Sequence, residues 1–238
     1  MSLVTHTVQA GFQPCIHAIG DRANRLALDA YEQVLTQSQR VELRPRIEHA
    51  QVLARSDIRR FARLGVIPAM QPSHATSDMY WAQDRLGPER IQGSYAWRQL
   101  LNTGAIIPCG SDSPVERVEP LLQLYAARTR QDTNGQPEGG WYPRERMAGL
   151  EALKSLTTWA AFAAVEDSTR GKILPGYDAD LTVLPINPVN CDPKALLDAQ
   201  VLMTIVDGQV VWHNKQGFRR LKARRPGSPA SSTRSPEE

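Results

Sequence analysis

The sequence predicts an α/β fold with a parallel sheet, followed by a small antiparallel β element. Up to about residue 170, short apolar runs alternate with amphipathic stretches, as they do in chains built from βα units. From Gly171 on, turn signals and alternating apolar positions replace that pattern, and "VLMTIVDGQVVWH" indicates two strands joined by Asp-Gly. We therefore predict one domain over residues 1–170, a second over 171–214, and a basic, Pro/Ser-rich tail over 215–238 that we expect to be disordered.

The first domain contains candidate strands that are short and apolar, separated by helices or long polar segments. The strand candidates are residues 12–18, 44–52, 66–72 and 105–112. The helix candidates are residues 21–38, 54–65, 96–104 and 149–165. Polar segments at 73–95 and 134–143 interrupt this order. Loops of that length in an α/β chain usually carry binding or catalytic residues.

Composition and charge exclude several classes of function. The chain has 238 residues, 41% of them hydrophobic, and a formal net charge of +3. Because the basic excess is concentrated in the last twenty or so residues, we expect no nucleic-acid surface. No apolar run approaches the ~20 residues that cross a bilayer, so no membrane partner is expected. The three cysteines have neither disulfide nor zinc-ribbon spacing, which favours a reducing, cytoplasmic location.

Polar side chains fall at the ends of three predicted strands. His17 ends the first strand, His49 the second and Asp112 the fourth. In a (β/α) barrel the carboxyl ends of the strands meet at one mouth, where catalytic residues lie. Two imidazoles and a carboxylate there suit a divalent cation of the Zn²⁺ type, with a carboxylate as general base. Taken singly, each has an ordinary alternative as a structural histidine or a turn-initiating aspartate.

Two further features near these strands have open or ordinary interpretations. His74 follows the third strand in "QPSH", where a substrate loop and plain surface are equally good alternatives. "GSDSP" around Asp112 lacks the central serine of a nucleophile elbow.

At these residues the chain resembles the amidohydrolase superfamily, in its YtcJ-like, amidohydrolase-3 branch. The resemblance rests on long, ordered motifs over residues 3 to about 213. They are "HAIGDRA", "RIEHAQ", "MQPSHATSDMYWAQDRLG", "GSDSPVE", "GGWYPRER" and "GKILPGYDADLTVL". The resemblance implies hydrolysis of C–N bonds in small amides, N-formyl compounds or cyclic ureides, with one or two divalent ions, most often Zn²⁺.

The resemblance also implies a role for particular residues. His17 and His49 correspond to the metal-binding histidines after the fifth and sixth strands of a TIM-type (β/α)8 barrel. Asp112 corresponds to the aspartate after the eighth strand, a metal ligand and the general base. His74 and Asp78 fall in the seventh-strand loop, which flanks the substrate. Arg85 matches a family position whose role is open, and we name it as a third candidate substrate-binding residue.

The family's first metal ligands, a His-x-His pair, occur nowhere in this sequence, and neither does its bridging lysine or glutamate after the fourth strand. We therefore expect the carboxyl-terminal half of a barrel, strands five to eight, with the second domain contributing strands to a composite β-sandwich. Such a chain is expected to be inactive alone and to form a homo-oligomer or depend on an amino-terminal half. The alternative is a non-catalytic half-barrel or truncated gene product that acts as a binding or assembly module.

Overall fold

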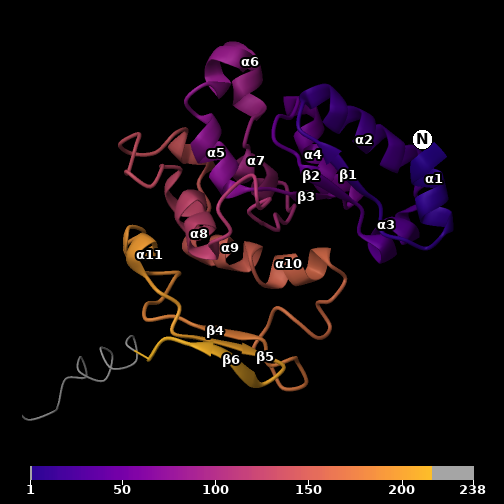
Figure 1. The fold of residues 1–238 in the computed structure, drawn as a ribbon. Coiled ribbons are helices and arrows are strands. Elements are labelled where there is room, and N and C mark those ends of the chain that lie inside the picture. Colours follow the sequence, from indigo (N-terminus) through magenta and orange to yellow (C-terminus); the bar gives the residue numbers. More distant parts are fainter. Residues whose placement is uncertain (1, 216–238) are drawn as a thin grey trace, which may run out of the picture.

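The computed structural model describes residues 2–215, and a three-stranded parallel sheet lies at its centre (Figure 1). The strands are β1 (Cys15–Ala18), β2 (Arg46–His49) and β3 (Ile67–Ala69), paired in the order β1-β2-β3. Each lies inside a strand candidate, so the predicted α/β class with parallel strands is confirmed. The predicted tail lies, from residue 216 on, outside the described residues.

Helices precede, separate and follow the strands of the parallel sheet. They are α1 (Ser2–Gln9), α2 (Asp21–Val34), α3 (Gln37–Leu43), α4 (Arg55–Leu64), α5 (Pro72–Asp78), α6 (Ala82–Arg90), η1 (Ile91–Gly93), α7 (Trp97–Asn102), α8 (Pro120–Thr129), η2 (Pro143–Glu145), α9 (Gly149–Ser155), α10 (Thr158–Ala163) and α11 (Ala195–Asp198). Helix α2 packs against β1 and α4. None of the described helices is long and apolar enough to cross a membrane.

The two faces of the parallel sheet differ in their surroundings. Ile47 is fully buried and Ala18 is 1% exposed, and both belong to the hydrophobic core. Side chains alternate between the faces of a strand, so Cys15 and His17 point the other way, and both are exposed. The sheet is therefore packed on one face, and β1 leaves the other face open.

The fourth strand candidate, 105–112, forms no ladder in the structure. Met70 N–H donates to Pro108 C=O at 3.0 Å and Gly110 N–H donates to Met70 C=O at 3.2 Å, which makes one isolated parallel bridge. Pro108 has no N–H to donate. The N–H of Cys109 donates instead to Ser155 C=O on α9. The segment still continues the sheet beside β3, so its end lies at the same edge as the ends of the strands.

A separate antiparallel sheet follows in the chain and lies below α10 in the view of Figure 1. Its strands are β4 (Leu181–Val183), β5 (Met203–Val206) and β6 (Gln209–His213), in that order. Asp207 and Gly208 between β5 and β6 have φ of 49° and 73°, the backbone that a two-residue type I′ turn requires.

The polar segment 73–95 is mostly helical, contrary to the loop that we predict from its composition. Helix α5 begins with Pro72, whose missing N–H costs nothing in a first turn. Helix α6 is interrupted at Gly87, where φ is 72° and Pro88 follows. Glycine and proline inside the segment interrupt the helical periodicity, so the sequence pattern does not predict these helices.

Two predicted helices are each divided into two. Residues 21–38 break at Leu35, and Thr36 starts α3 with a capping box that includes Gln39. Residues 149–165 break at Thr157, whose φ of −129° and ψ of −95° are not helical. Helix α8 is missed altogether because six of its ten residues are buried, which leaves no apolar stripe to detect.

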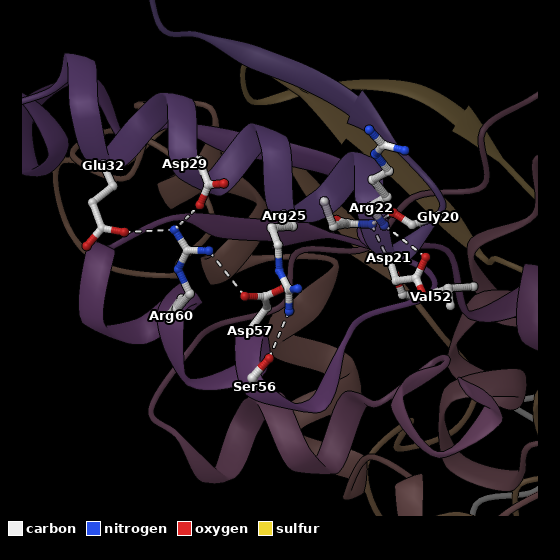
Figure 2. A network of polar contacts seen from close by, with 11 residues as sticks. Gly20, Asp21, Arg22, Arg25, Asp29, Glu32, Val52, Ser56, Asp57 and Arg60 are labelled. Carbon is white, nitrogen blue, oxygen red and sulfur yellow. Dashed lines mark hydrogen bonds and ion pairs between the residues drawn. The ribbon is translucent and has the colours of Figure 1, made fainter. Parts of the chain in front are cut away.

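An ion-pair network holds α2 against α4 (Figure 2). Arg60 on α4 donates to Asp29 and Glu32 on α2, each at 2.7 Å, and to Asp57 at 3.1 Å. Arg25 on α2 donates to Asp57 at 2.8 Å, and the Asp57 side chain is only 4% exposed. One half-buried guanidinium thus joins three carboxylates on two helices.

We expect Arg60→Met to lower the free energy of unfolding by about 1–2 kcal/mol, because it removes several charge-assisted hydrogen bonds to a partly buried network. Urea denaturation measures the change. The matched control is Arg63→Met on the same helix, whose 58% exposed side chain pairs with Glu32 alone. It should cost no more than about 0.5 kcal/mol. Equal losses in both variants would contradict the special role of Arg60.

Candidate metal centre

The carboxyl ends of the strands bring polar side chains from distant parts of the sequence to one edge of the sheet. His17 lies on β1, and His49 ends β2. His74 lies in the first turns of α5, directly after β3, and Asp112 follows the segment beside β3. Parallel strands point their ends the same way, so these positions lie together although 95 residues separate the first from the last.

The four side chains form a row. The ring of His17 meets the ring of His49 edge-on, with centroids 4.5 Å apart. The His49 ring stacks on that of His74 at 5.7 Å, and His74 Nε2 is 3.8 Å from Asp112 Oδ2. One ligand atom each from His49, His74 and Asp112 lies within 4.8 Å of the other two, and His17 is outside this group.

The hydrogen bonds of the histidines leave nitrogen atoms available to a cation. His49 Nδ1 is 2.8 Å from Gln71 Oε1, an acceptor that fixes the proton on Nδ1 and leaves the Nε2 lone pair free. His74 is 8% exposed, yet its Nε2 has no hydrogen-bond partner among the described residues. The 3.8 Å to Asp112 is too long for a hydrogen bond.

A cation fits this arrangement. Ligands about 2 Å from a tetrahedral ion lie roughly 3.4 Å from one another, so the group needs only a small contraction. Two imidazoles and a carboxylate are donors that Zn²⁺ and related ions accept. A bound cation would give the buried Nε2 of His74 the partner that it lacks among the described residues.

Backbone geometry at the site is strained. His49 has φ of 75°, Ala50 of 44° and Asp112 of 57°. These values lie in the left-handed region, which costs an L-residue on the order of 1–3 kcal/mol each. Such conformations persist where the surrounding fold enforces them, and they are common at functional sites. Here they include two of the three residues whose ligand atoms lie within 4.8 Å of one another.

Asp78 is held by two buried neighbours. Its Oδ2 accepts from Tyr95 OH at 2.5 Å and from Gln51 Nε2 at 2.6 Å. Burial raises the pKa of Asp78, and the hydrogen bond from Tyr95 opposes that rise. Asp78 ends the helix that carries His74, so this trio fixes α5 relative to the end of β2.

Burial also lowers the pKa of His74, which favours the neutral imidazole, while the charges of Asp78, Glu116 and Asp112 oppose that shift. A neutral imidazole is the form that binds a metal ion.

The sequence-predicted residues are therefore not all brought together. His49, His74 and Asp112 form the group. His17 meets the ring of His49 edge-on from outside the group, and Asp78 accepts from Tyr95 and Gln51 instead. Arg85 is exposed on α6, and among the described residues no hydrogen bond or ion pair joins it to the others. The assignment of metal and substrate roles to these residues remains a prediction. Gln71, Ser77 and Glu116 are absent from the predicted set, although each lies within a motif that carries a predicted residue.

A parallel α/β sheet with imidazole and carboxylate donors at the ends of its strands is the arrangement of metal-dependent hydrolases. A family model described as "Amidohydrolase family" matches residues 2–212. The chain is 35% identical over 210 residues to the putative amidohydrolase YtcJ of Bacillus subtilis (strain 168), covering 88% of this chain and 39% of that protein. It is 30% identical over 211 residues to an N-substituted formamide deformylase of Arthrobacter pascens, covering 87% and 38%.

A solved structure agrees. The chain superposes on an uncharacterized metal-dependent hydrolase from Pyrococcus horikoshii OT3 with a TM-score of 0.68 and 28% identity, covering 81% of this chain and 38% of that one. The chain belongs to the amidohydrolase family, in its YtcJ-like branch. It spans about two-fifths of the length of these relatives.

Proposed function

We propose that the chain contributes the metal-binding carboxyl-terminal half of a barrel to an enzyme that hydrolyses C–N bonds in small amide, N-formyl or cyclic ureide substrates. The observation that carries this proposal is the group of His49, His74 and Asp112, with a buried His74 nitrogen that lacks a partner. The name of the Arthrobacter relative, a formamide deformylase, favours N-formyl compounds among these substrates.

Each residue has a separate task in this proposal. When bound, a divalent cation polarises the scissile carbonyl and lowers the pKa of water. His49 holds the cation through Nε2 and is itself held by Gln71. Asp112 is 41% exposed, so it can face a substrate, accept a proton from the attacking water and return it to the leaving nitrogen.

The open face of the parallel sheet supports a need for more polypeptide. Cys15 and His17 are exposed on β1, whose outer edge has no strand beside it among the described residues. We propose that a second copy or a separate amino-terminal half covers this face in the active enzyme, which we place in the cytoplasm.

The test loads the purified chain with Zn²⁺ or Mn²⁺ and measures amine release from an N-formyl amine, a simple amide and a cyclic ureide. Light scattering gives the molar mass of the same sample. Release that requires the metal and disappears in Asp112→Asn supports the proposal. Stoichiometric metal in an assembled protein that hydrolyses none of the three favours the alternative, a non-catalytic binding module. Absence of metal binding overturns the metal-dependent proposal.

A further inference from the structure

Residues 111–118, which carry Asp112, lie on the surface with few contacts to the rest of the molecule. From 112 to 119 every residue is exposed except Glu116, which is half-buried. Among the hydrogen bonds between described residues, one joins 111–118 to a distant segment: Ser77 Oγ donates to Glu116 Oε1 at 2.6 Å. The remaining ones are local, from Val115 N–H to Asp112 C=O and from Arg117 to Glu119.

The two residues of this hydrogen bond each lie a few positions after a candidate metal ligand. Ser77 comes three residues after His74 on α5, so the two side chains lie on neighbouring positions of one helix face. Glu116 comes four residues after Asp112. Helix α5 and the segment therefore meet at two places: Ser77 to Glu116, which is a hydrogen bond, and His74 to Asp112 at 3.8 Å, which is not.

We propose that Ser77 and Glu116 are positioning residues whose hydrogen bond sets the distance of Asp112 from His49 and His74. This inference rests on the cation site of the proposed function. Hydrogen bonds to carboxylates are stronger than neutral ones, and partners behind metal ligands raise affinity by orienting them. Without the bond, residues 111–118 sample more conformations, and cation binding must also order the segment.

The first test is cation affinity, measured by Co²⁺ absorption titration in competition with a chelator. Ser77→Ala and Glu116→Ala should each weaken Co²⁺ binding about tenfold. Ser77→Thr keeps the hydroxyl and should stay close to wild type. The double variant should bind no more weakly than either single one, because both remove the same contact. The matched control is Glu119→Ala, which makes the same charge change directly after the segment but loses a local bond to Arg117.

The second test needs no cation and separates this inference from the proposed function. Hydrogen exchange of the Val115 amide in metal-free protein should become several-fold faster in Ser77→Ala and Glu116→Ala, and stay unchanged in Glu119→Ala. Unchanged Val115 exchange in both variants overturns the inference, whether or not the wild type binds Co²⁺. A wild type that binds Co²⁺ no better than its variants do also overturns it. A wild type that binds no Co²⁺ overturns the proposed function, and the exchange rates then decide whether Ser77 holds the segment.

Discussion

Asp112→Asn and His49→Ala are each expected to lower the affinity for Zn²⁺ or Co²⁺ by about 100-fold or more. Both residues belong to the ligand set predicted from the sequence and to the group that the structure brings together. Losing a ligand should cost more than the ~10- to 100-fold that losing an outer hydrogen-bond partner costs. Isothermal titration of metal-free protein measures the change. Near-wild-type affinity in either variant would contradict a site at this edge of the sheet.

A comparison of His17→Ala with His74→Ala then identifies the third ligand. We expect the larger loss of affinity in His74→Ala, because its Nε2 is buried, unpartnered and 3.8 Å from Asp112. His17 meets the ring of His49 edge-on and is outside the group. A larger loss in His17→Ala would instead support the ligand set that the resemblance implies, with His74 left to face the substrate. His6→Ala, on α1, is the matched control and should bind as wild type does.

The second large effect is expected at Arg130, whose replacement by Met should lower the free energy of unfolding by about 3 kcal/mol. Arg130 is fully buried, and it donates to Tyr95 C=O at 3.0 Å and to Trp141 C=O at 2.6 Å. Its guanidinium also lies over the rings of Trp97 and Trp141. Burial lowers the pKa of Arg130 to about 10, so the side chain is still charged at neutral pH. Methionine fills similar space but removes both of these hydrogen bonds and the cation–π contacts, so Tyr95 C=O keeps the N–H of Trp97 as donor and Trp141 C=O loses its donor.

Urea denaturation with an unchanged m-value measures this loss. Arg144→Met, at an exposed position near the same loop, is the control and should cost no more than about 0.5 kcal/mol. A Met variant as stable as wild type would show that the cost of burying the charge cancels its contacts, as it does for some buried ion pairs. Because Arg130 joins the loop at Trp141 to the backbone of Tyr95, which binds Asp78, the variant should also loosen the wall behind His74.

Local pattern was enough to predict the strands and the helices that have one apolar face. Helix α4 illustrates this: Ile58, Phe61 and Leu64 are buried at helical spacing, and Gly65 ends it with φ of 66°. Pattern failed where burial has no single direction, as in α8, and where glycine or proline sits inside a helical segment, as in α6.

The sequence by itself determined the α/β class, the family and the donor residues at the strand ends, because alternation, turn residues and motifs are local in the chain. Only the tertiary structure decided which donors meet. His17 and His49 lie on neighbouring strands, but it is His74, on α5, whose Nε2 comes within 3.8 Å of Asp112. The Ser77–Glu116 contact likewise joins residues 39 positions apart. The periodicity of helices and strands is local, so it does not predict a contact over that separation. Strand register and helix docking fix such contacts, and both depend on the packed core as a whole.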